Sequence, residues 1–442
     1  MTNKPETLPA VKDDLFLYSG RRVSNITNHL VIEFNETIQV DLLKKAFKLS
    51  IQSETILQYK FQVPTLRKPR WVLDKDIDPD SLFEFVEAND SDDMESLSKE
   101  FLHIVLHPLQ DNQIKLRLIR HESDKLIIKI NHIAADGGAM AEYTSRLADT
   151  YSNLLNDQSY IPKNISGDRS LDQIYKQFSF KEKLNIIPYS FKVIRNRMFP
   201  RGNWSLPLKN GSDHDPKFLK STIENNSYVR LKSFCKHNGL TVNDTITALY
   251  IRALYGLIKP PKGTPIRMVS TISLRRYLPS GVGQALCNLS SVLIINIGHK
   301  LGENLAHTSK KVHDEVEWQK NSYLGLNSHR SSPLNLVSLP YPIVSTINTI
   351  FGLFGFLIID SAKLPPLFSN TGRFTEKNFN FEGTSIKNLY FYAPVSYYPV
   401  SFVSATGFES KINICATFNE DVIAEKIMQS IFSTIEEEIE QL

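Results

Sequence analysis

The stretch from Lys125 to Gly138 constrains the fold most, because it joins a strand, a histidine and two glycines without a break. Residues 125–132 alternate with a period of two, which predicts a strand that ends at the histidine. One face of this strand carries Leu126, Ile128, Ile130 and His132. Asn131 points to the opposite face. Gly137 and Gly138 then predict a turn at backbone angles that a side chain would forbid.

A helix is expected directly after this turn. Residues 138–155 place Met140, Tyr143, Leu147, Tyr151 and Leu154 along one stripe, which is typical of an amphipathic helix. Further strands are expected at 29–34, 114–119, 265–274, 288–297, 389–397, 400–406 and 411–418. Further helices are expected at 41–53, 241–255 and 420–442. Because both halves mix the two element types, the fold class is α/β or α+β.

Composition excludes several classes of protein. At 442 residues the chain predicts two or three domains, or one fused unit. The net charge of +4 is too weak to indicate a nucleic-acid binder. Three cysteines are too few for a disulfide scaffold and favour a reducing compartment. Residues 1–14 contain no apolar stretch of the kind that a secretory signal needs, so we expect a cytoplasmic protein.

One segment is unusually basic. Residues 173–209 hold eight Lys and Arg against one acidic residue, Glu182, with aromatic residues between the cations. Such a segment favours contact with an anionic membrane surface or an acidic partner. The alternative interpretation is a solvated connection between two lobes. Its flanks, 162–169 and 202–216, have the Pro, Gly, Asn and Asp content of loops.

A second unusual segment carries no charge from Ser331 to Ile359. Prolines interrupt its first half, and only residues 350–359 are continuously apolar, which is shorter than the roughly 20 residues of a membrane span. We interpret this segment as a buried helix. The alternative is that residues 350–359 line an acyl pocket or dip into lipid as a peripheral membrane contact.

Common catalytic and binding motifs are missing from the sequence. It contains no GxSxG, no P-loop, no HExxH and no CxxC. Gly281 and Gly283 form a GxG without the third glycine of a dinucleotide site. His103 and His107 are four residues apart but lack a third ligand nearby, so no metal site is expected.

The most informative motif is Asn131-His132-Ile133-Ala134-Ala135-Asp136-Gly137-Gly138. The strand delivers the imidazole of His132 into an apolar interior, where a neutral histidine has the pKa range that a general base needs. Asp136 belongs to the turn and could hold the loop by pairing with a cation. The alternative is a core histidine followed by an ordinary Asp-Gly turn.

This motif resembles the HHxxxDG signature of an acyltransferase superfamily. The superfamily includes chloramphenicol acetyltransferase, condensation domains of peptide synthetases, polyketide-associated acyltransferases, alcohol acetyltransferases and wax ester synthases. The match falls on His132, Asp136 and Gly137. The segment MVSTISLRRYLPSGVGQALCNLSS is similar to the SLR…GN region, and PLFSNTGRF is similar to the SN-x-G region of alcohol acetyltransferases. The resemblance covers roughly residues 10–440.

The resemblance implies two chloramphenicol acetyltransferase-like lobes in a V shape with a tunnel between them. It implies an N-terminal lobe at 1–165, a basic connecting segment at 166–216 and a C-terminal lobe at 217–442. His132 would be the general base, and Asp136 would be structural and pair with an arginine, for which Arg275 is the best candidate. No bound cofactor is implied, since acyl-CoA or a phosphopantetheinyl carrier protein would be the co-substrate.

Two departures from the family pattern concern the substrate channel. Asn131 replaces the first signature histidine, and the DFGWG segment of many members is not recognisable. Asn131, Ser369 and Asn370 are the candidate channel residues. The expected activity is acyl transfer to a hydroxyl group by a monomeric enzyme. The alternatives are amide formation on carrier-bound amines and an inactive homologue that only docks a carrier protein.

Overall fold

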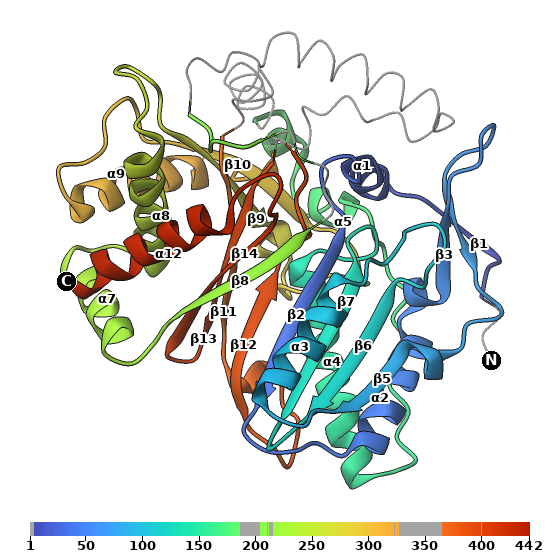
Figure 1. Cartoon of the computed structure of the whole chain (residues 1–442). Coiled ribbons are helices and arrows are strands. Elements are labelled where there is room, and N and C mark those ends of the chain that lie inside the picture. Colours follow the sequence, from blue (N-terminus) through green and yellow to red (C-terminus); the bar gives the residue numbers. More distant parts are fainter. Residues whose placement is uncertain are drawn as a thin grey trace.

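A computed structural model describes residues 4–185, 204–209, 211, 215–321, 323–326, 365–398 and 400–442. It contains two lobes that lie side by side (Figure 1). Each lobe is a mixed sheet covered by helices, which confirms the predicted fold class. The uncharged segment 331–359 and residues 186–203 of the basic segment lie outside the described residues.

The first lobe is built on a five-stranded sheet in the order β12-β2-β7-β6-β5. Its strands are β2 (Thr27–Phe34), β5 (Phe83–Glu87), β6 (Ile114–Arg120), β7 (Asp124–Asn131) and β12 (Ile386–Tyr392). Neighbouring strands are antiparallel, except for β5 and β6, which are parallel. Strand β12 comes from late in the sequence, so the two halves of the chain share this sheet. The predicted domain boundaries themselves stay a prediction.

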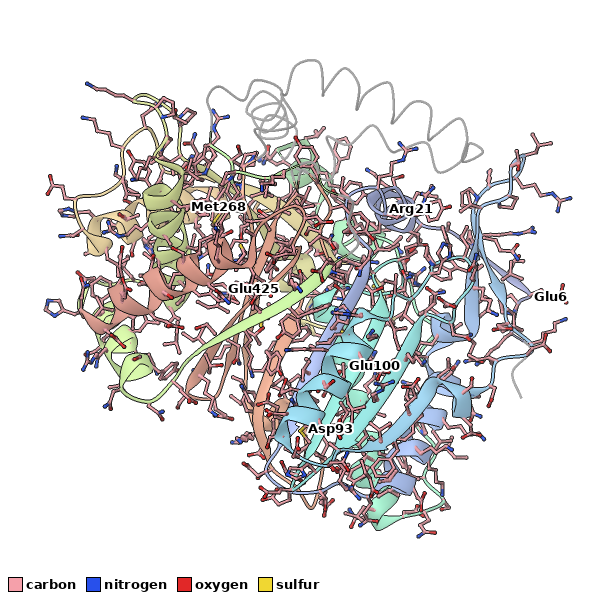
Figure 2. All side chains as sticks on the ribbon, viewed as in Figure 1. Glu6, Arg21, Asp93, Glu100, Met268 and Glu425 are labelled. Atoms are coloured by element: carbon pink, nitrogen blue, oxygen red, sulfur yellow. The ribbon has the colours of Figure 1, made fainter. Side chains whose placement is uncertain are left out.

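Helices cover both faces of this sheet because its strands alternate apolar side chains between them. Leu30 and Ile128 belong to the core beneath α2 (Val40–Ser53) and α4 (Gly137–Asn156). Val31 and Ile127 face the opposite side and pack with Phe101 and Leu102 of α3 (Ser91–His103). In Figure 2, Asp93 and Glu100 lie along α3, and Glu100 pairs with Arg117 of β6 at 3.0 Å.

Smaller elements surround the first lobe. A three-stranded sheet, in the order β1-β4-β3, consists of β1 (Thr7–Pro9), β3 (Tyr59–Gln62) and β4 (Arg70–Leu73). Helix α1 (Lys12–Gly20) follows β1, and the short helix α5 (Asp172–Tyr175) lies in the connecting segment. Sequence reasoning did not predict α1, whose apolar residues form no clear stripe, nor α3.

The second lobe is built on a six-stranded sheet in the order β10-β9-β11-β13-β14-β8. Its strands are β8 (Pro216–Ile223), β9 (Arg267–Ser273), β10 (Ser290–Asn296), β11 (Leu367–Phe374), β13 (Phe402–Phe408) and β14 (Lys411–Asn419). Strand β11 is parallel to β9 and β13, while the other pairs are antiparallel. Its helices are α7 (Asn225–His237), α8 (Val242–Ile258), α9 (Leu305–Lys320) and α12 (Glu425–Glu440). Met268 of β9 is fully buried in this lobe (Figure 2).

Candidate active site

His132 lies one residue beyond the end of β7, where the chain leaves the sheet. Its backbone N–H still donates to the carbonyl of Ile26 at 2.8 Å, so the end of the sheet holds it in place. The side chain is half-buried. Its Nδ1 lies 3.2 Å from Oδ1 of Asn288, a residue of the second lobe that lies two positions before the start of β10. The imidazole therefore lies where the two lobes meet.

The contacts of Asn288 determine which imidazole nitrogen carries the proton. The Nδ2 group of Asn288 donates to the carbonyls of His132 at 2.9 Å and Ile133 at 3.0 Å. Its Oδ1 therefore faces the ring as an acceptor, and Nδ1 of His132 must donate. Nε2 is then the ring nitrogen that keeps its lone pair.

The charge state of His132 follows from its surroundings. Burial lowers the pKa of His132, because a charged imidazolium loses its solvation there. The negative charge of Asp136 acts in the opposite direction but does not outweigh burial. The imidazole is therefore neutral at pH 7, with a lone pair on Nε2 that can accept a proton.

Asp136 holds the loop that follows His132. As the N-cap of α4, it accepts the backbone N–H of Ala139 at 2.8 Å. It also accepts the backbone N–H of Leu289 at 2.7 Å and the Nη1 group of Arg275 at 3.0 Å. Burial alone would raise the pKa of Asp136, but Arg275 and these hydrogen bonds lower it. The carboxylate stays charged and joins the two lobes.

Arg275, from the 3-10 helix Leu274–Tyr277, is the partner that the sequence predicted for Asp136, and the two side chains form that ion pair. The guanidinium also donates through Nε to Glu142 of α4 at 2.5 Å and through Nη2 to the carbonyl of Cys287 at 3.3 Å. Arg275 is buried, so two carboxylates from α4 and its cap neutralise it in the interior. Sequence reasoning missed Glu142.

The predicted role of the glycine pair is wrong. Gly137 and Gly138 form the first turn of α4, and neither is among the glycines with positive φ. Gly138 is needed for a different reason, because a Cβ there would lie 2.8 Å from Nη1 of Arg275. At Gly137 there is room for a side chain. The nearest atom to a Cβ there would be Cγ2 of Thr371, at 4.0 Å. The close approach of an arginine from the other lobe explains the second glycine.

Asn131 is fully buried and bonds to the protein backbone. Its Nδ2 donates to the carbonyl of Leu106 at 2.9 Å, and its Oδ1 accepts the N–H of Ile133 at 3.0 Å. Like Asp136, it therefore stabilises the loop around His132. Its predicted role in a substrate channel stays a prediction.

Ser369 and Asn370 lie on β11. Ser369 pairs with the hydroxyl of Thr271, and Asn370 donates to Asn243 of α8 at 2.7 Å. No contact brings either side chain to His132 in the described part of the chain. Their neighbour Thr371 is the residue that approaches Gly137. The channel role of both residues stays a prediction.

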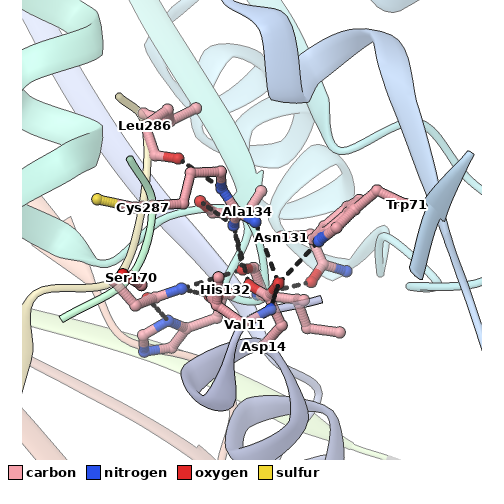
Figure 3. A network of polar contacts seen from close by, with 12 residues as sticks. Val11, Asp14, Trp71, Asn131, His132, Ala134, Ser170, Leu286 and Cys287 are labelled. Atoms are coloured by element: carbon pink, nitrogen blue, oxygen red, sulfur yellow. Dashed lines mark hydrogen bonds and ion pairs between the residues drawn. The ribbon is translucent and has the colours of Figure 1, made fainter. Parts of the chain in front are cut away.

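A network that sequence reasoning missed surrounds the loop that follows His132 (Figure 3). Arg169, from the connecting segment, pairs with both carboxylate oxygens of Asp14 in α1, at 3.1 and 2.9 Å. Arg169 also donates to the carbonyls of Ile133 at 3.2 Å and Leu286 at 3.0 Å. Asn288 was also missed, although the sequence signal was there: it ends the region similar to the family's SLR…GN segment.

Neither a metal-binding cluster nor a membrane-spanning helix occurs in the part of the chain that the structure describes. Among the described ranges there is no group of three or more His, Cys, Asp and Glu side chains that could hold a metal ion. None of the helices in those ranges is long and apolar enough to cross a membrane. His103 packs against Phe218 of the second lobe, with ring centroids 5.7 Å apart.

Comparisons with known proteins agree with this architecture. No family model and no curated protein sequence matches the chain. Among solved structures, the first condensation domain of the calcium-dependent antibiotic synthetase is similar, with a TM-score of 0.74 and 14% identity over 99% of this chain and 97% of that one. Polyketide synthase associated protein 5 from Mycobacterium tuberculosis has a TM-score of 0.63 and 15% identity, covering 96% of each chain.

A third similar structure is the trichothecene 15-O-acetyltransferase of Fusarium sporotrichioides. Its TM-score is 0.69 at 10% identity, over 98% of this chain and 95% of that one. At such low identity the likeness shows the fold alone. The chain has the two-lobe fold that condensation domains share with these acyltransferases, as the motif predicted.

Proposed function

We propose that this protein is an acyltransferase that moves an acyl group from a thioester to a hydroxyl group, with His132 as the general base. The observation that carries the proposal is the neutral imidazole, whose Nδ1 is held by Asn288 so that Nε2 keeps its lone pair. A base in this state can remove a proton at neutral pH.

The reaction would proceed by direct transfer. Nε2 of His132 takes the proton of the acceptor hydroxyl while the oxygen attacks the thioester carbonyl. The tetrahedral intermediate then collapses, the carbon–sulfur bond breaks, and the imidazolium returns its proton to the leaving thiolate. The products are an ester, a free thiol and the neutral histidine, so no cofactor is consumed. The donor would be acyl-CoA or an acyl-carrier protein, since either one presents the acyl group as a thioester.

Amide formation is the second candidate, since a condensation domain has the highest TM-score among the similar structures reported above. The chemistry at His132 would be the same, with an amine in place of the hydroxyl. Acceptor choice therefore separates the two candidates.

An inactive homologue that only docks a carrier protein is the third alternative. We also propose a cytoplasmic location, with the basic segment 173–209 as the candidate for peripheral membrane contact.

A thiol-release assay tests the proposal. Purified protein is mixed with a panel of acyl-CoAs and with either alcohols or amines, and free CoA is measured with a thiol reagent. We expect acceptor-dependent release, and His132→Ala should lower the rate by about 10²–10⁴-fold, the usual contribution of a general base. His307→Ala is the matched control, because His307 is an exposed histidine on α9. Equal rates for His132→Ala and wild type would refute the assignment.

A further inference from the structure

Arg169, in the connecting segment, donates hydrogen bonds to three separate parts of the molecule. Its Nε donates to the carbonyl of Leu286 in the second lobe at 3.0 Å. Its Nη1 and Nη2 bond to the two oxygens of Asp14. Nη2 also donates to the carbonyls of Ile133 at 3.2 Å and Ala134 at 3.4 Å, both within the loop that follows His132. All three guanidinium nitrogens are therefore used.

Asp14 holds this guanidinium in place. The carboxylate is fully buried, and the side chain of Arg169 is 9% exposed, so the pair is shielded from water. The same carboxylate accepts the indole N–H of Trp71 on β4 at 2.8 Å and the backbone N–H of Val11 at 2.9 Å. The Arg169 guanidinium also lies over the Trp71 ring, 5.0 Å from its centroid. An arginine with this many partners has little freedom to move.

The Arg169–Asp14 pair is connected to the surroundings of His132 through the backbone carbonyl of Ile133. The carbonyl of Ile133 accepts from Arg169 at 3.2 Å and from Asn288 at 3.0 Å. Asn288 is also the residue that faces Nδ1 of His132. Arg169 and Asn288 thus share an acceptor, and Leu286 links Arg169 to the segment that carries Asn288. A shift of the guanidinium would therefore move the Ile133–Ala134 peptide, which lies one residue beyond His132.

We propose that Arg169, oriented by Asp14, is a positioning residue that fixes the His132 imidazole for proton transfer. This inference rests on the proposed function. It assigns the connecting segment a role beyond joining the lobes, because its arginine fastens α1, β4, the loop that follows His132 and the second lobe to one another. The role requires a planar fork of donors, so lysine should not replace the arginine.

The matched control is a second arginine–aspartate pair of the same kind. Arg120 donates through Nε and Nη2 to the two oxygens of Asp124 at 2.8 and 2.7 Å, and to the carbonyl of Ile38 at 2.6 Å. Asp124 is fully buried, as Asp14 is. No contact of this pair involves the loop after His132. Arg120→Lys therefore reports the structural cost of weakening such a pair without its effect on the imidazole.

The experiment compares Arg169→Lys, Asp14→Asn and Arg120→Lys at a temperature well below the melting point of each variant. We expect Arg169→Lys and Asp14→Asn to lower kcat by about 10²-fold with little change in KM, the size of effect expected for a misplacement of about 1 Å. Arg120→Lys should keep kcat near the wild-type value. Wild-type kcat in Arg169→Lys, or equal losses in Arg169→Lys and Arg120→Lys, would overturn the proposal.

A second readout does not depend on turnover. NMR titration of His132 should give a higher pKa in Arg169→Lys than in wild type, because a loosened loop admits water to the ring, and the same pKa in Arg120→Lys. An unchanged His132 titration in Arg169→Lys would overturn the proposal. If wild type turns over no thioester, the proposed function fails, and this titration alone decides the positioning role.

Discussion

Replacement of Asp136 by alanine should destabilise the protein strongly, because three buried groups depend on this carboxylate. Loss of the N-cap of α4 costs about 1 kcal/mol. The backbone N–H of Leu289, 2.7 Å from the carboxylate, would stay buried without a partner, at a cost of roughly 1–3 kcal/mol. Arg275 would lose one of its two carboxylates, which adds a cost toward the lower end of the roughly 3–5 kcal/mol for breaking a buried ion pair. The sum is about 5 kcal/mol, since these terms overlap.

Urea unfolding of Asp136→Ala measures this cost, with Glu142→Ala as the comparison. Glu142 also contacts Arg275, at 2.5 Å, and accepts the N–H of Gly283 at 3.2 Å, but it caps no helix. We expect Glu142→Ala to lose about 1 kcal/mol less stability than Asp136→Ala, since it lacks the capping term. If Asp136→Ala costs less than about 1 kcal/mol, or no more than Glu142→Ala, the ranking of these contacts is wrong.

Three further predictions follow from local geometry. His132 must be neutral to accept a proton, and burial lowers its pKa. In a pH profile of kcat/KM, the loss of activity toward acid should therefore have its midpoint below pH 6.5. A midpoint above that value would contradict the prediction. In thermal melting, Gly138→Ala should lower stability by about 1–3 kcal/mol, because its Cβ would clash with Arg275. Gly137→Ala should leave the stability unchanged. Similar losses in the two variants would argue against the clash. The three buried cysteines, Cys235, Cys287 and Cys415, should resist alkylation until the protein unfolds. Burial raises the pKa of each thiol and so suppresses the reactive thiolate. Rapid labelling of the native protein would contradict this.

The local part of the site could be predicted from the sequence. The alternation before His132 gave the end of β7, and the apolar stripe after Gly138 gave α4, since both patterns depend on residues close together in the chain. The strand period also placed Asn131 away from His132, and the structure shows its amide bonded to Leu106 and Ile133 instead. Arg275 was identified through the resemblance, not through its spacing.

The non-local part could not be predicted. No periodicity relates Asp14 to Arg169. The two meet only because α1 and the connecting segment both fold back onto the loop that follows His132. The role of Gly138 was misread for the same reason, since the atom that excludes a side chain there comes from Arg275 in the other lobe. The sequence predicts the strand at 389–397 but not its partner, and β12 pairs with β2 of the first lobe.

These long-range contacts imply that neither lobe can form the site alone. The first lobe supplies His132 and Asp136, and the second supplies Asn288 and Arg275. Without the second lobe, Asp136 would keep its helix cap but lose its buried cation, and β2 would lose its partner β12. An unpaired buried charge and an open sheet edge are both costly in an isolated domain. The assembly of the two lobes therefore orients His132, and under the proposed function changes at their junction should affect the rate even where no substrate is touched.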